Sequence, residues 1–159
     1  MALYRLVYAE PPYSEGESDF RDFADSLPRR AKAPNFRLVI ARESFRAVGF
    51  AMGHNLTPNT RWWQGAITTL PEDLTLEHDG RTFAVIELAV LAERRRQGYA
   101  RALHAHLLAD LREERVTLLV RPDATAARST YEALGYEAVG QIRPFPDAPI
   151  YNAMVRQLR

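Results

Sequence analysis

"ELAVLAERRRQGYARALHAHLL", residues 87–108, contains the pattern from which we infer the fold of this chain. An apolar stretch leads through three arginines, Arg94 to Arg96, into Gly98 and then into a helix-forming segment. The first turn of a helix has backbone N–H groups without partners, and the aligned peptide dipoles add positive charge there. Gly98 lets a ligand approach the backbone, and arginine donors suit phosphate oxygens. The stretch therefore predicts a phosphate-binding turn, with a solvated turn as the alternative.

Composition limits the class of protein. The chain has 159 residues, of which 47% are hydrophobic, enough for one packed core. The formal net charge of +1 argues against a nucleic-acid partner, because such binding needs a broad basic face. There is no cysteine, which excludes disulfides, thiolate metal sites and a cysteine nucleophile. No apolar run approaches the roughly 20 residues of a membrane span, and no signal-peptide stretch is visible, so we expect a cytoplasmic protein without a membrane partner.

The hydrophobic periodicity predicts a single mixed α/β domain over residues 1–159. In chain order we expect a strand at 3–9, a helix after Ser18, two strands within 36–54, some strand within 62–70, a strand at 82–91, a helix at 98–113, a strand at 116–120, a helix from an Asp123 cap to about Leu134, and strands at 136–142 and 150–158. A helix connects strand 82–91 to strand 116–120, so these two strands should be parallel.

The same stretch resembles the central motif of the GNAT acetyltransferase superfamily. The signature Gln/Arg-x-x-Gly-x-Gly/Ala is matched by Arg95-Arg96-Gln97-Gly98-Tyr99-Ala100, with Leu88 and Val90 upstream and Leu103 downstream at the expected spacing. Ala92 departs from the pattern, because many members have proline there. The resemblance covers essentially the whole chain and implies the acyl-CoA N-acyltransferase fold. In that fold a central mixed sheet is splayed, here between strands 82–91 and 116–120, and is flanked by helices.

The resemblance also implies acetyl-CoA as co-substrate and no metal, and the four histidines show no ligand-like clustering. The backbone of Leu88, Ala89 and Val90 would pair with the pantetheine arm as an extra strand would. The remaining cofactor-binding residues would be Arg95, Arg96, Gln97, Gly98, Tyr99, Ala100 and Arg101. Among these, the backbone N–H groups from about Arg96 to Arg101 would hold the pyrophosphate.

Two residues are candidates for the chemistry. Glu87 is the only charged residue within "TFAVIELAVL" (82–91), and burial would raise its pKa toward a value useful to a general base. An ion pair with an arginine that only holds the sheet is an equal alternative for Glu87. Tyr131 matches the register of a second family segment, in which a helix tyrosine reaches the CoA sulfur, so the resemblance implies a proton donor; a core tyrosine is the alternative. Glu77, His78 and His54 are weaker candidates for the base.

The predicted function is therefore N-acetylation. An acetyl group would move from acetyl-CoA to a primary amine of a small molecule or peptide by direct attack, since no cysteine is present to carry it. The alternative is an acyl-CoA-binding module for sensing or assembly, with little catalysis. The sequence leaves the acceptor, the acyl length and the oligomeric state open, a homodimer included.

Overall fold

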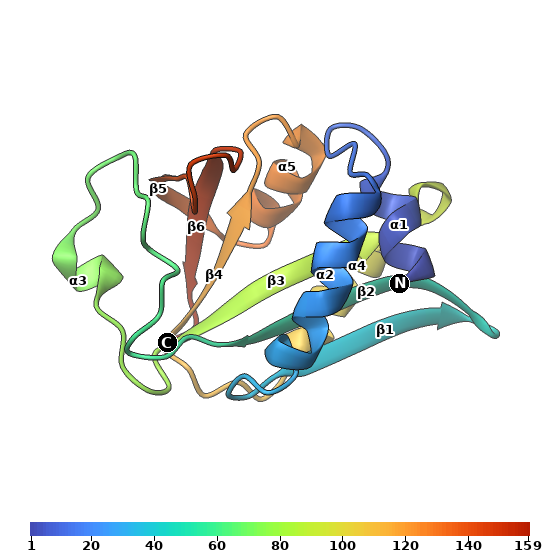
Figure 1. The fold of residues 1–159 in the computed structure, drawn as a ribbon. Helices are drawn as coiled ribbons and strands as arrows, with labels where there is room; N and C mark the ends of the chain where they lie inside the picture. The colour runs from blue at the N-terminus through green and yellow to red at the C-terminus, as the bar shows by residue number, and fades with distance from the viewer. The chain divides into compact units, whose positions relative to one another are not determined.

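The computed structural model describes residues 1–159 and contains six strands in the order β1-β2-β3-β4-β6-β5. This mixed sheet is flanked by helices, as predicted, and Figure 1 shows the elements in chain order. The chain divides into two units that interleave along the sequence. The first unit comprises residues 1–54 and 85–111, and the second comprises residues 55–84 and 112–159.

The first unit is built from two helices, a β-hairpin, most of a third strand and a further helix. Its elements are α1 (Ala2–Tyr8), α2 (Glu17–Arg30), β1 (Arg37–Glu43), β2 (Arg46–Asn55), the later part of β3 (Thr82–Val90), a 3-10 turn (Ala92–Arg94) and α4 (Tyr99–Leu107). β1 and β2 pair antiparallel, with a register shift between Ala41 and Arg42. The last residue of β2, Asn55, and the first three of β3 belong to the second unit.

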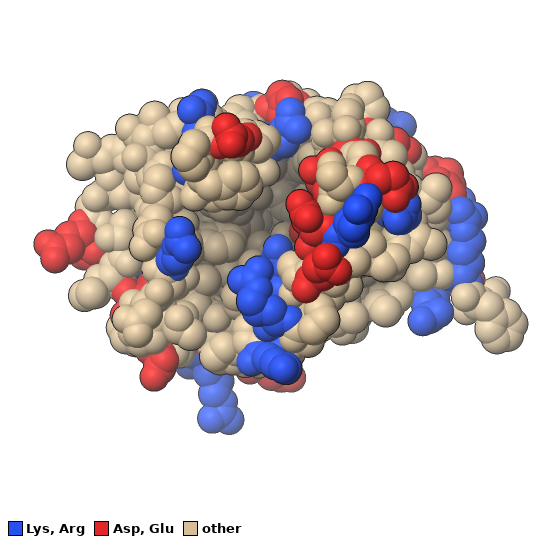
Figure 2. All heavy atoms as spheres, in the orientation of Figure 1, with Lys and Arg blue, Asp and Glu red and all other residues tan.

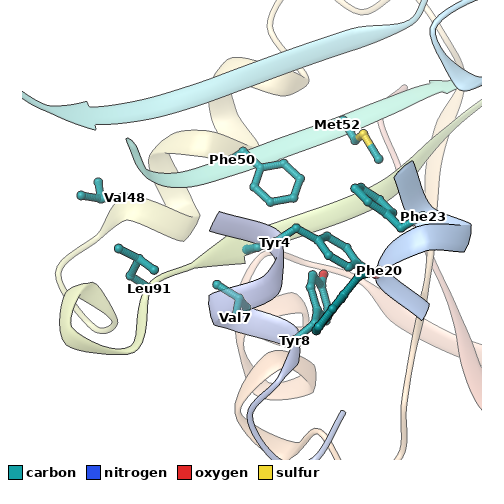
Figure 3. Close-up of a cluster of buried hydrophobic side chains, with 10 residues drawn as sticks. Tyr4, Val7, Tyr8, Phe20, Phe23, Val48, Phe50, Met52 and Leu91 are labelled. Carbon is teal, nitrogen blue, oxygen red and sulfur yellow. The ribbon is translucent and has the colours of Figure 1, made fainter. Parts of the chain in front are cut away.

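An aromatic core holds the first unit together. Figure 3 shows side chains from α1 and α2 gathered against β2 and the end of β3. Its buried members are Tyr4, Val7, Tyr8, Phe20, Phe23, Val48, Phe50, Met52, Ala89 and Leu91. The rings of Tyr4 and Phe23 are stacked with their centroids 3.7 Å apart. Val48, Phe50 and Met52 alternate along β2, so this face of the strand meets α1 and α2.

Helix α4 lies against the opposite face of β2. A Cβ built on Gly49 would lie 2.9 Å from the carbonyl oxygen of Ala89 and 3.0 Å from Cδ1 of Leu103 in α4. Glycine is therefore required at this position so that β2, β3 and α4 can approach closely. This packing fixes the N-terminal end of α4 against the strands that precede it.

The second unit contains α3 (Glu72–Thr75), the start of β3, β4 (Arg115–Val120), α5 (Thr125–Ala133), β5 (Glu137–Ile142) and β6 (Tyr151–Gln157). β6 pairs antiparallel with both β4 and β5. β3 and β4 are parallel, as predicted, and their register pairs Thr82–Ala84 with Arg115–Thr117 and includes no later residue of β3. A short parallel ladder is what a splayed sheet requires.

Three local predictions are wrong. The predicted strand 3–9 falls mostly within helix α1 (Ala2–Tyr8), because Tyr4, Val7 and Tyr8 have the i, i+3, i+4 spacing of one buried helical face. Within 62–70 the only β-structure is an isolated bridge between Ala66 and Ile142. Asp123 does not cap α5: Ala124 is the N-cap, and Asp123 is paired with Arg121 instead.

A buried ion pair replaces apolar packing in part of the second unit. Arg115 donates to Glu77 at 2.8 Å, and these side chains are 3% and 0% exposed. Trp63 Nε1 and the Thr82 hydroxyl donate to the same Glu77 oxygen at 2.9 and 3.0 Å. Such a pair is stabilised by this hydrogen bonding, and removing one partner typically costs about 3–5 kcal/mol.

No helix is long and apolar enough to cross a lipid bilayer. Figure 2 shows both acidic and basic side chains on the drawn face of the molecule.

Candidate active site

The turn before α4 presents a row of backbone donors. Gly98 is the N-cap of α4 and has φ +87°, a left-handed conformation that favours glycine. The first helical hydrogen bond runs from Ala102 N–H to the Gly98 carbonyl at 3.0 Å. The N–H groups of residues 96–101 have no acceptor within the chain. A Cβ on Gly98 would meet no atom within 4 Å, so the space in front of these donors is open.

The four arginines of this turn fall into two groups. Arg94 and Arg95 have acidic partners: Nε of Arg94 lies 2.8 Å from each oxygen of Glu43, and Arg95 donates to Glu10 at 2.9 Å. Arg95 also donates to the Val90 carbonyl at 3.2 Å. These two side chains therefore shape the turn. Of the arginines predicted to bind the cofactor, Arg95 thus already has an acidic partner within the chain.

Arg96 and Arg101 are different, because both are exposed and neither has a hydrogen bond or ion pair within the chain. Arg96 itself has φ +60°, which is unusual for a non-glycine residue. Arg96 and Arg101 are the first and last residues of the segment whose N–H groups are free. Their charges are not paired with an acidic side chain, so both guanidinium groups are available to an anion.

The strand segment that precedes the turn is close-packed. Ala89 and Val90 are buried, and Leu88 is partly buried. Leu88–Val90 lies beyond the part of β3 that the parallel register with β4 includes. The Gln97 amide donates to the Glu93 carbonyl at 3.1 Å, and the side chains of Tyr99 and Ala100 are partly buried in the first turn of α4.

Glu87 is partly buried and lies in a polar cluster of the first unit. The Tyr8 hydroxyl donates a hydrogen bond to Oε2 of Glu87. Burial raises the pKa of Glu87 to about 7, while the Tyr8 hydrogen bond and the positive charge of Arg30 lower it. No arginine forms an ion pair with Glu87, so the structural alternative considered from the sequence is wrong. A carboxylate with this pKa can accept a proton near neutral pH.

A second carboxylate, that of Glu15, faces the same cluster. Burial raises the pKa of Glu15, and interaction with the Tyr4 hydroxyl lowers it. Its Oε2 atom is buried and has no hydrogen-bond partner. The charge of Glu15 adds to the upward shift of the Glu87 pKa, and the backbone N–H of Glu15 is fixed to the Tyr8 carbonyl at 2.9 Å. The Oε2 atom of Glu15 can therefore accept a hydrogen bond that no group of the chain donates.

Tyr131 belongs to the second unit, whereas Glu87 and the turn before α4 belong to the first. It is buried on α5, and its ring meets that of Tyr136 edge to face with centroids 5.8 Å apart. Of the weaker candidates for the base, Glu77 is enclosed in its ion pair with Arg115. His78 is exposed and lies 3.3 Å from Glu114.

Sequence reasoning missed Tyr8, Glu15 and Glu43. Tyr8 is 79 residues from Glu87, and Glu43 is 51 residues from Arg94, so no local pattern links either pair. The i, i+4 spacing of Tyr4 and Tyr8 was the available signal, because it places both rings on one helical face.

The fold and this turn define an acyltransferase of the GNAT class, and comparison with known families agrees. The model of the acetyltransferase (GNAT) family matches residues 1–136. The chain therefore belongs to the GNAT family of acetyltransferases. No curated protein sequence is significantly similar to it.

Solved structures share the fold at low sequence identity. The ribosomal-protein-S18-alanine N-acetyltransferase of Escherichia coli is 18% identical, with a TM-score of 0.63 over 99% of this chain and 84% of that one. Naa20 of Chaetomium thermophilum, solved with a bisubstrate analogue, is 20% identical, with a TM-score of 0.64 over 99% and 81%. The protein yncA of Salmonella typhimurium, solved with its cofactor acetyl-CoA, is 15% identical, with a TM-score of 0.63 over 99% and 86%.

Proposed function

We propose that this acetyltransferase transfers the acetyl group of acetyl-CoA to a primary amine by direct attack. The observation that carries the proposal is the row of unpaired N–H groups at residues 96–101, beside an open space at Gly98. A diphosphate would satisfy these donors, and the dipole of α4 favours its charge. Arg96 and Arg101 would add two full positive charges. CoA carries such a diphosphate, and the solved relative yncA holds acetyl-CoA.

In the proposed reaction three groups of the chain take part. An acceptor that arrives as an ammonium ion first releases one proton to solvent; its neutral nitrogen then attacks the thioester carbonyl carbon, the C–S bond breaks, and the amide forms. Glu87 accepts the proton that the amine loses, and a pKa of about 7 suits that role near neutral pH. Tyr131 would return a proton to the CoA thiolate. The backbone N–H of the Val90 region would stabilise the oxyanion. No cysteine is present to form an acetyl-cysteine intermediate.

The carboxylates of Glu15 and Glu87 favour an acceptor that arrives as an ammonium ion. Both have a raised pKa because burial disfavours their charge, and a bound cation would offset that cost. An ammonium group has three N–H donors, and the Glu15 Oε2 atom has no donor in the chain. A primary amine, whether on a small molecule or at the end of a peptide, meets this requirement.

Thiol release in the presence of primary amines tests the proposal. The purified chain should bind acetyl-CoA and release CoA only when an amine is added, and mass spectrometry should find the acetylated amine. Neutral amides of matched size should not support release. If CoA binds but no amine in a broad panel gives turnover between pH 6 and 9, the chain is an acyl-CoA-binding module and the proposal is wrong.

A further inference from the structure

Glu43 contacts both ends of the turn that precedes α4. Its carboxylate, at the last residue of β1, lies 2.8 Å from Nε of Arg94 through each oxygen. The Tyr99 hydroxyl donates to Oε1 of the same carboxylate at 2.6 Å. Arg94 is the residue before the turn 95–98, and Tyr99 is the first residue after it. The Glu43 side chain therefore contacts the residues on both sides of this turn, and we call this pair of contacts the clamp.

The carboxylate is itself fixed by the β1–β2 hairpin. Glu43 is in register with Arg46 at the end of the antiparallel ladder. Arg46 in turn donates to Glu93 of the 3-10 turn at 2.8 Å, but these side chains are 60% and 48% exposed, so this second pair contributes little. The ion pairs Arg94–Glu43 and Glu93–Arg46 therefore connect this segment to residues about fifty positions earlier in the chain.

Charge alone would argue against a carboxylate at this position. Glu43 is ionised at neutral pH, because the Tyr99 hydrogen bond and then Arg94 lower its pKa. It neutralises one arginine of a basic turn, and its own charge repels any anion bound nearby. The charge of Glu43 therefore weakens anion binding, and any favourable contribution of Glu43 must come from the positions in which it holds Arg94 and Tyr99. These two effects have opposite signs, so they can be separated by measurement.

We propose that Glu43 is a positioning residue for the CoA diphosphate. By holding Arg94 and Tyr99 it fixes the ends of the turn, and so keeps the N–H groups of residues 96–101 aimed at one point. Donors held in place before binding cost less to order when the ligand arrives. The inference rests on the proposed acetyl-CoA site and adds to it a residue that touches no ligand.

The test compares Glu43→Gln with the matched control Glu93→Gln. Both substitutions remove one carboxylate charge near the turn and close to Arg94, but the Glu93 side chain pairs with Arg46 and forms no side-chain hydrogen bond or ion pair with Arg94 or Tyr99. Calorimetric titration with CoA should show about five- to tenfold weaker binding for Glu43→Gln, the usual scale for losing one or two charge-assisted hydrogen bonds. Glu93→Gln should bind CoA as well as the wild type or better, because only a repulsive charge is lost.

Steady-state kinetics supply a second readout. Glu43→Gln should raise the KM for acetyl-CoA by a similar factor, with kcat and the KM for the amine nearly unchanged. Tyr99→Phe keeps the Glu43–Arg94 pair, removes one end of the clamp, and should give a smaller rise. If Glu43→Gln does not fold, as judged by its melting temperature, Tyr99→Phe alone decides: unchanged CoA affinity in that variant overturns the inference.

The outcomes separate the inference from the proposed function. If the wild-type chain does not bind CoA, both are wrong. If the wild type binds CoA and Glu43→Gln binds it equally well or more tightly, the positioning role is wrong and the proposed function is not affected. Equal weakening in Glu43→Gln and Glu93→Gln also overturns the inference, because the loss would then not depend on the clamp.

Discussion

The hydroxyl of Tyr8, at the end of α1, donates a hydrogen bond to the Glu87 carboxylate in β3, 79 residues further along the chain. This contact joins a helix of the aromatic core to the strand that leads into the turn before α4. The hydrogen bond also opposes the effect of burial on the pKa of Glu87, because burial raises this pKa and the hydrogen bond lowers it. The result is a carboxyl group with a pKa of about 7, between a charged and a neutral form under physiological conditions.

Glu87→Gln should lower kcat by about a hundredfold or more, because a general base typically contributes 10²–10⁴-fold. In the wild type, kcat should rise with pH through about 7 as Glu87 loses its proton, and then level off. The variant should lose this limb of the profile. Stopped or continuous assays of thiol release from pH 5.5 to 9 measure it, with acetyl-CoA affinity as the control. An unchanged limb in the variant would assign the titration to another group.

Tyr8→Phe should move the same limb to higher pH. The Tyr8 hydrogen bond stabilises the ionised carboxylate, so its loss raises the pKa of Glu87 further. At pH 7 the variant should therefore be slower than the wild type, and at pH 9 the two rates should converge. A uniform loss of rate at every pH would show that Tyr8 acts through packing alone.

Folding stability should respond to Glu87 with a definite sign. Its pKa in the folded state is about 7, above the ordinary value of 4.5, so the folded state holds a proton that the unfolded state releases. The contribution of this group to the free energy of unfolding is then greatest below about pH 4.5 and declines as the pH rises through 7. Gln at position 87 does not titrate, so the Glu87→Gln variant lacks this pH dependence.

Urea unfolding of both proteins at pH 4.5, 6 and 8 measures this difference. The free energy of unfolding of the Gln variant should rise relative to that of the wild type as the pH increases, by at most about 3 kcal/mol at pH 8. Glu93→Gln is the control, because the pKa of Glu93 is lowered and the sign is reversed. A stability difference for Glu87→Gln that is constant with pH would mean that the Glu87 pKa is not raised.

The long apolar elements were predictable because their patterns are unambiguous. Strand 82–91 is β3, helix 98–113 is the shorter α4, and strand 116–120 is β4. Helix α1 was not predictable by propensity, since tyrosine and valine favour strands. Its conformation is decided by the one face that it buries against Phe20, Phe23 and β2, a tertiary effect.

For the candidate site, local sequence identified the turn and not its supports. Gly98 and the free N–H groups belong to one strand–turn–helix segment, so a motif contains them. The partners Glu10 and Glu43 lie 85 and 51 residues from the arginines that they bind, and the chain's topology alone brings them together. Arginines that look equivalent in the sequence therefore have different roles.

Gly98→Glu should abolish acetyl-CoA binding, because it places a side chain and a negative charge in the open space before α4. Gly80→Glu is a matched control: Gly80 also has a positive φ, +75°, and also has nothing within 4 Å of a Cβ. Both substitutions should cost similar stability through backbone strain, about 1 kcal/mol or more. Calorimetry should find CoA binding intact in the Gly80 variant only. Unchanged affinity in Gly98→Glu would remove this turn from the site.

Tyr131→Phe tests the proton donor. Because phenylalanine keeps the ring on α5 and its contact with Tyr136, the fold should be retained, with a change in melting temperature of a few degrees at most. The hydroxyl alone is lost, so kcat should fall by about tenfold or more, while the Kd for CoA changes little. The loss should shrink with an acetyl thioester whose thiol has a lower pKa, since such a thiolate leaves without a proton. Equal rates for wild type and variant would take Tyr131 out of the mechanism and leave it as a core residue of the second unit.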